Sequence, residues 1–247
     1  MRPRTRSTSR LFFIYILVFV FFGFFIFASA SLGLLGRSGP SFSTIAIKQL
    51  LILGFGIAAM VAVSKFDYRL WRKYALPFFV ISLILSALVF VPNFGIESGG
   101  AKRWIPIGSV SFQPSEFLKL AFVIYLAALI TKMRSSGNDN NAQYVIFFIL
   151  IALVGVVLVL QPDIDALGIM ITSSFAILFA AGTKLKNLLI ILLIFIAAGA
   201  AVLYTQPHVV NRIQTFFDDN PDKQGSAYQV TQSLIAVGAG KLSGRGL

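Results

Sequence analysis

Long apolar runs separated by short polar segments dominate the hydrophobic pattern of the chain. The runs lie at residues 11–30, 45–63, 74–92, 116–131, 144–160, 166–182 and 187–204. Each is close to the ~20 residues that a helix needs to cross a bilayer. The pattern therefore predicts a transmembrane part over residues 11–204 with about seven helices, between a basic tail at 1–10 and a polar segment at 205–247.

The first apolar run has a second reading. Ala28-Ser29-Ala30 resembles the small-residue cleavage site of a secretory signal peptide. The run before it is longer than the apolar core of a typical signal peptide, so we expect a retained first helix.

Composition and charge agree with an all-α, polytopic helical membrane protein. Hydrophobic residues make up 57% of the chain and charged residues 12%, with a mean hydropathy of +0.85. The chain has no cysteine, which excludes disulfides, Cys-bound zinc and thiol nucleophiles.

The basic residues predict the orientation. With a cytoplasmic N-terminus, the inner segments hold most of the cations: Arg2, Arg4, Arg6, Arg10, Lys65, Arg69, Arg72, Lys73, Lys132, Arg134, Lys184 and Lys186. The positive-inside rule favours this arrangement. Most of the net charge of +12 then reflects topology, and we expect membrane lipids rather than nucleic acid as the partner.

The densest polar chemistry between two spans lies in the outer segment 99–119, GGAKRWIPIGSVSFQPSEFLK. Pro114 is predicted in the first turn of the fourth helix, with Glu116 at the positive end of the helix dipole. Lys119 follows one turn later on the same face, so each charge can neutralise the other. Such a pair just inside a membrane helix indicates a lined cavity.

A second polar interruption, Gln161-Pro162-Asp163, divides an apolar stretch about twice as long as one bilayer crossing. Pro162 disfavours helix at Gln161, which predicts a tight outer turn. Asp163 can cap the next helix by accepting its free N–H groups, or it can have a functional role, and both remain open.

The polar segment 205–247 is predicted to be an outer loop with a short interfacial helix around residues 210–217. His208 is read as an interfacial polar residue, because no second His or Cys can complete a metal site. Asp218, Asp219 and Asp222 are typical of a solvated loop, although such a loop also attracts divalent cations. The sequence requires no cofactor.

An outward-facing cavity with Lys102 and Arg103 at its rim and Trp104 beside them suits an amphipathic anion whose tail stays in the lipid. A polyprenyl diphosphate is such a ligand. The alternative is that the two cations contact lipid headgroups and Trp104 belongs to an aromatic belt.

Five segments in succession resemble the signatures of the SEDS family, the FtsW/RodA-type peptidoglycan glycosyltransferases: GGAKRWIPIG, SFQPSEFLK, QPD, NRIQTFF and AYQVTQSLIAVGAGKLSGRGL. The resemblance implies about ten spans in the bacterial cytoplasmic membrane and polymerisation of lipid II at its outer face. It implies a class B penicillin-binding protein, a transpeptidase, as partner. SFQPSEFLK and AYQVTQSLIAVGAG favour the division branch over the elongation branch.

The resemblance also assigns residues. Trp104 matches the family's loop Trp, and Glu116, Lys119 and Asp163 match a polar cluster in the membrane cavity. Gln113, Pro114, Ser115 and Arg103 match the same signatures. We expect Lys102 and Arg103 to attract the diphosphate, and Glu116 with Lys119 to shape and charge the cavity.

Two departures from the family pattern limit the expectation. Asp165 stands where the family has a small residue, and it either disturbs the turn or faces water. The family's proposed catalytic Asp would lie beyond Leu247, so we expect no catalytic residue within this chain and no glycan polymerisation by the chain as written. A lipid II translocator and a noncatalytic cell-wall scaffold are the alternative functions.

Overall fold

The computed structural model describes residues 5–32, 42–92, 94–98, 101–108, 110–135, 140–205, 210, 228–241 and 244. These belong to two compact units. The first unit comprises residues 1–66 with 234–247, and the second comprises residues 67–233. Each unit is described by itself.

The first unit contains two long apolar helices, α1 (Thr5–Leu32) and α2 (Phe42–Ser64), which pack against each other. The predicted spans at 11–30 and 45–63 lie inside them. A further helix, α9 (Tyr228–Gly240), runs across the sequence boundary between the two units.

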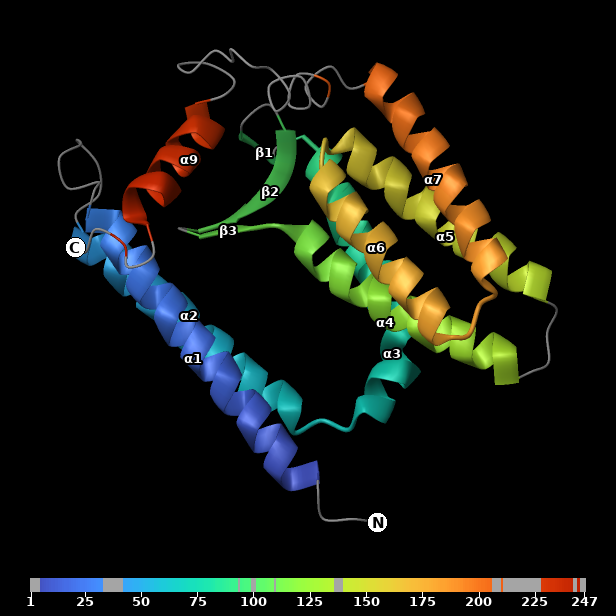
Figure 1. The fold of residues 1–247 in the computed structure, drawn as a ribbon, viewed down its shortest axis with the longest axis horizontal. Coiled ribbons are helices and arrows are strands. Elements are labelled where there is room, and N and C mark those ends of the chain that lie inside the picture. Colours follow the sequence, from blue (N-terminus) through green and yellow to red (C-terminus); the bar gives the residue numbers. More distant parts are fainter. Residues whose placement is uncertain are drawn as a thin grey trace. The chain divides into compact units, whose positions relative to one another are not determined.

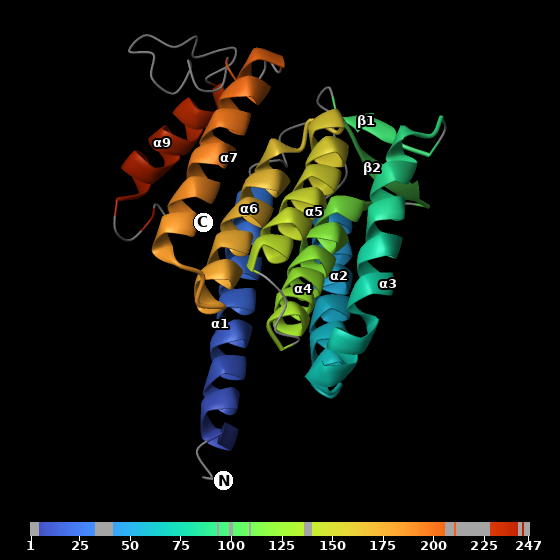
Figure 2. The same ribbon diagram turned by 90° about the vertical axis from the view of Figure 1, so that its right-hand side faces the viewer.

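The second unit is a helical bundle built around α4 (Figures 1 and 2). Its helices are α3 (Tyr68–Ala87), followed by a 3-10 turn at Leu88–Phe90, α4 (Pro114–Ser135), α5 (Asn140–Leu160), α6 (Ile164–Ala180) and α7 (Leu185–Thr205). α4 packs against α3, α5 and α6, and α7 packs against α6. Phe122, Leu126, Leu158 and Met170 lie fully buried at the centre of the bundle.

Local sequence sets the ends of these helices. Asp67 begins α3 as an N-cap, because its side chain accepts a hydrogen bond from the Arg69 N–H at 2.9 Å. α4 begins at Pro114, as predicted, where the missing N–H of proline costs nothing. α6 ends in a turn at Gly182, whose φ of +76° is readily available only to glycine.

A small antiparallel sheet joins α3 to α4, with strands β1 (Ile96–Ser98), β2 (Ala101–Ile107) and β3 (Val110–Phe112) in that order. The hydrophobic pattern of the sequence did not indicate these strands. Ile107 pairs with Val110 across a two-residue connection whose first residue, Gly108, has a φ of +61°. A glycine at that position is typical of a tight hairpin, and the sheet gives the polar segment between α3 and α4 a fixed register.

Within the described residues, three helical stretches are long and apolar enough to span a membrane: Arg10–Ser29, Thr44–Ser64 and Tyr68–Phe90. Shorter apolar helices include Tyr144–Leu160, Ile164–Ala180 and Leu185–Ala201. α4 coincides with the remaining predicted span and carries Glu116, Lys119, Lys132 and Arg134. The predicted class, a polytopic helical membrane protein, is confirmed.

The predicted outer loop is described only in part. α9 was not predicted, and its exposed apolar residues include Val230, Leu234 and Val237. His208, the Asp residues at 218, 219 and 222, and most of the helix expected at 210–217 lie outside the described residues.

Candidate functional site

The Asp163 carboxylate is the centre of a buried polar cluster at the end of the bundle where α5 ends and α4 and α6 begin. Asp163 is 4% exposed. Its Oδ2 accepts hydrogen bonds from Ser115 Oγ at 2.8 Å and from Gln113 Nε2 at 3.2 Å, and its Oδ1 lies 3.7 Å from Arg103 Nη1. A buried carboxylate needs such partners, because its desolvation is otherwise very costly.

Of the two roles left open for Asp163, capping of α6 by the side chain is the one that the structure does not show. Asp163 occupies the N-cap position, but its side chain makes no capping hydrogen bond to α6. The carboxylate binds Ser115 and Gln113 instead, and its backbone carbonyl accepts from the Leu167 N–H at 3.3 Å. The Asp163 side chain therefore does not stabilise the start of α6 and instead connects α6 to the start of α4 and to β2.

Two residues at the start of α4 shape the carboxylate side of the cluster. Gln113 precedes α4, and Ser115 is its second residue and is 1% exposed. Gln113 Nε2 also lies 3.0 Å from Ser115 Oγ, so the two side chains and Asp163 form one network. Ser115 places the carboxylate at the N-terminus of α4, where the helix dipole favours a negative charge.

The sheet divides the two cations that were expected to act together. Arg103 reaches Asp163 and keeps 25% of its side chain exposed. Lys102 is exposed, and its cross-strand neighbour is Glu97. The pairing of β1 with β2 shifts register between Ile96 and Glu97, so Arg103 is an extra residue between Lys102 and Trp104, as in a β-bulge. Trp104 is half-buried and pairs with Ile96.

Glu116 and Lys119 form the ion pair that their spacing predicted. Lys119 Nζ lies 2.8 Å from Glu116 Oε1. The Glu116 side chain is 57% exposed and that of Lys119 is 21% exposed. Glu116 and Lys119 contact each other, whereas Asp163 contacts Ser115, Gln113 and Arg103. The polar cluster expected from the sequence is therefore two separate groups, a partly exposed ion pair and a buried network.

Asp165 faces water, which is one of the two outcomes expected for it. It is exposed in the first turn of α6, which begins regularly at Ile164. A carboxylate there is favourable because the N-terminus of a helix carries a partial positive charge.

Two features at this end of the bundle were missed from the sequence. One is the hydrogen bond from Ser115 to Asp163. The position of Ser115 directly after Pro114, at the predicted start of a helix, was a usable signal for it. The other is a bond from the buried Gln161 Nε2 to the Ser86 carbonyl at 2.6 Å, which joins residues 75 positions apart. No sequence spacing indicates that second contact.

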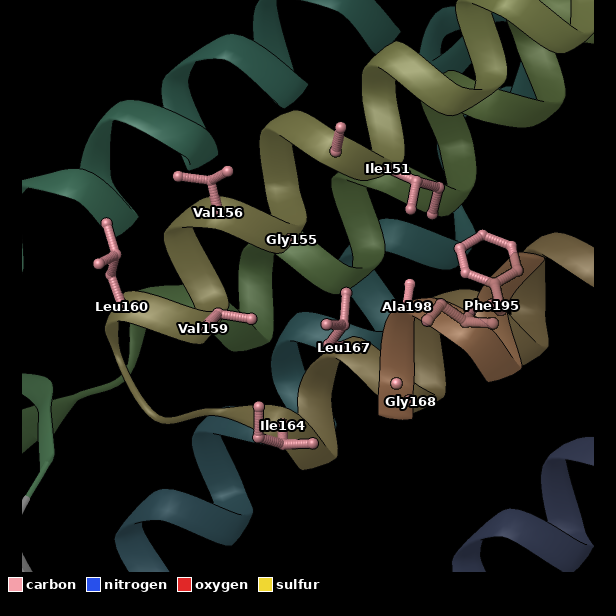
Figure 3. Close-up of a pocket in the computed structure, with 13 residues that line it drawn as sticks. Ile151, Gly155, Val156, Val159, Leu160, Ile164, Leu167, Gly168, Phe195 and Ala198 are labelled. Carbon is pink, nitrogen blue, oxygen red and sulfur yellow. The ribbon is translucent and has the colours of Figure 1, made fainter. Parts of the chain in front are cut away.

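An apolar groove of about 740 Å³ lies between α5, α6 and α7 (Figure 3). Gly155, Gly168 and Gly199 provide its smallest lining residues. It extends from Leu160 and Ile164, which flank the Gln161-Pro162-Asp163 turn, to Ile151 and Phe195. The groove offers no acid, base or metal ligand. Among the described residues there is also no group of three His, Cys, Asp or Glu side chains that could hold a metal ion.

The fold and the cluster define a helical membrane protein with a buried, charged site at one end of its bundle. Residues 9–247 match the family model FTSW_RODA_SPOVE, described as "Cell cycle protein". The chain belongs to this family, the FtsW/RodA/SpoVE or SEDS proteins.

Curated relatives are about one third identical to the chain over the residues that align. "Stage V sporulation protein E" of Bacillus subtilis is 30% identical over 200 residues, which are 81% of this chain and 55% of that protein. "Probable peptidoglycan glycosyltransferase FtsW" of Trichlorobacter lovleyi is 34% identical over 203 residues, 81% of this chain and 52% of that protein. The chain thus spans about half the length of the curated relatives it matches.

Solved structures agree with this fold. A chain from "Structural coordination of polymerization and crosslinking by a peptidoglycan synthase complex" has a TM-score of 0.69 at 26% identity, covering 92% of this chain and 66% of that one. The Thermus thermophilus rod shape determining protein RodA has a TM-score of 0.55 at 27% identity, covering 71% of this chain and 58% of that one.

Proposed function

We propose that the protein carrying this chain is a peptidoglycan glycosyltransferase that polymerises lipid II at the outer face of the bacterial cytoplasmic membrane. Family membership and relatives named as probable FtsW glycosyltransferases support this proposal. The charge distribution supports an orientation in which the N-terminus is cytoplasmic and the Asp163 cluster faces outward.

The position of the Arg103 guanidinium beside Asp163 is the observation that supports the proposal best. The guanidinium is part-exposed and lies 3.7 Å from Asp163 Oδ1, a distance that leaves its N–H donors available to a second anion. A diphosphate presents oxygens that match the planar fork of a guanidinium. Arg103 can therefore bind the diphosphate of lipid II while Asp163 holds the guanidinium in place.

The other site residues receive roles that follow from their exposure. Lys102, exposed on β2, attracts the anionic headgroup at the membrane surface, and Trp104 offers an aromatic face to a sugar. Glu116 and Lys119 charge the first turns of α4, and Gln113 holds Asp163. No divalent cation is assigned to the described residues.

A class B penicillin-binding protein is the proposed partner. The structural neighbour named above comes from a peptidoglycan synthase complex described by its coordination of polymerisation and crosslinking. A transpeptidase that crosslinks the glycan product would act on the same side of the membrane.

Polymerisation of lipid II in proteoliposomes by the purified protein that carries this chain, alone and with the transpeptidase, tests the proposal. We expect Trp104→Ala and Asp163→Asn to abolish product formation, and Asp165→Asn, a change of an exposed carboxylate in the next helix, to leave it. Translocation of lipid II across the membrane is measured in proteoliposomes that contain the same protein. Transport without glycan product would contradict the proposal and favour a translocator.

A further inference from the structure

Gln161 connects the turn before α6 to the end of α3. It follows the last residue of α5, is 1% exposed, and donates its Nε2 hydrogen to the Ser86 carbonyl at 2.6 Å. Ser86 is also fully buried and lies in the last turn of α3, which ends at Ala87. The carbonyls of a last turn lack partners within their own helix, so the Gln161 amide supplies one from another element.

Asp163 anchors the other end of the same turn. Its side chain binds α4 through Ser115 and β2 through Arg103. Its backbone N–H donates to the Leu158 carbonyl at 2.8 Å, which ties the turn back to α5. Pro162, between the two anchors, has no N–H to add a further bond. The side chains on either side of Pro162 therefore fix the turn to α3 in one direction and to α4 and β2 in the other.

We propose that Gln161 is a positioning residue that holds Asp163 within reach of Arg103. The Arg103–Asp163 distance of 3.7 Å is near the limit of an ion pair, so a small outward shift of the turn separates the two groups. Without its bond to α3, the turn is held only through Asp163 and can shift toward the start of α6. There the Asp163 side chain can take up the local capping bonds that it does not make in this structure.

A double-mutant cycle tests the inference. The thermal stability of the purified chain in detergent is measured for Arg103→Ala, Asp163→Ala and the double variant, in the parent chain and in a Gln161→Met background. Methionine has a similar length and no donor, so the change removes the bond while largely filling the same space. We expect the Arg103–Asp163 coupling to be present in the parent chain and to fall to within error of zero in the Gln161→Met background.

Two controls separate positioning from general loosening. The Glu116–Lys119 coupling, measured in the same backgrounds, should keep its size, because this pair lies within α4 and is not held by the turn. Ser86→Ala should leave the Arg103–Asp163 coupling intact, because Gln161 binds the main-chain carbonyl and not the Ser86 hydroxyl.

Equal Arg103–Asp163 coupling in the parent and Gln161→Met backgrounds would overturn the inference, and so would an absence of coupling in the parent chain. An equal loss at Glu116–Lys119 would show that Gln161 is only a general structural residue. If the Gln161→Met chain does not accumulate, Gln161→Asn replaces it. The Asn amide is one methylene too short to reach the Ser86 carbonyl, so the Arg103–Asp163 coupling should again fall to within error of zero. The cycle needs no enzymatic activity, so its outcome is independent of the proposed function.

Discussion

At the scale of single residues, the choice between capping and function at Asp163 depends on distant partners. Both options fit the local sequence, because an Asp after a proline and before an apolar run is a common N-cap. Ser115 and Gln113, which bind the carboxylate in place of the first turn of α6, lie 48 and 50 positions earlier in the chain. The Glu116–Lys119 pair could be predicted from spacing alone, because both residues belong to one helix face.

Ser115→Ala is predicted to lower the free energy of unfolding by about 1–3 kcal/mol, because it leaves a buried carboxylate without its shortest hydrogen bond. Ser173→Ala is the matched control. Ser173 is partly exposed, and its hydroxyl donates to the Ile169 carbonyl one turn earlier on the same helix, so its loss should cost less than about 0.5 kcal/mol.

Denaturant or thermal unfolding of the two variants in one detergent measures the difference. Equal effects of Ser115→Ala and Ser173→Ala would mean that the Ser115–Asp163 bond contributes nothing specific.

At the scale of elements, helices were more predictable than strands. Apolar runs, Pro114 and Pro162 locate the helices and their ends, because helix formation inside a membrane depends mainly on hydropathy and on local breakers. The sheet was missed because β1 and β3 have only three residues each and β2 contains a proline and two cations. Its usable signals were the Gly108 turn and the Gly99-Gly100 pair.

The turn between α6 and α7 requires glycine at position 182. Gly182 has a φ of +76°, and an added Cβ would lie 3.4 Å from Arg134 Nη1. Gly182→Ala is therefore predicted to destabilise the chain by about 1–2 kcal/mol. Gly168→Ala, in the middle of α6 with nothing within 4 Å of the added Cβ, should be neutral or stabilise by up to about 1 kcal/mol.

The melting temperatures of the two glycine variants in one detergent give the comparison. If Gly182→Ala were as stable as Gly168→Ala, the left-handed turn would not be a constraint on this connection.

At the scale of the whole molecule, hydropathy and charge predict the class and the orientation, but they do not predict the site. Asp163 and Gln161 are buried because α4 packs against α3, α5 and α6. The local sequence around the two residues does not predict this packing. The resemblance to the family predicted a functional role for Asp163. Its partners became visible only when the elements were assembled.

The orientation can be tested with single cysteines, because the chain has none of its own. Ser111→Cys, exposed on β3, should react with a membrane-impermeant maleimide in intact spheroplasts. Ser135→Cys, exposed at the end of α4, should react only after the membrane is permeabilised. The reverse pattern would contradict a cytoplasmic N-terminus.

Binding of lipid II to the purified chain in nanodiscs, with and without Arg103, tests the central claim most directly. Arg103→Ala is predicted to weaken binding about tenfold or more, the equivalent of about 1.4 kcal/mol for a lost charge-assisted contact to the diphosphate. Arg72→Ala, at an exposed cation on α3, serves as the control and should bind as the parent chain does. Equal affinities of all three chains would contradict the assignment of the Asp163–Arg103 cluster as the lipid II site.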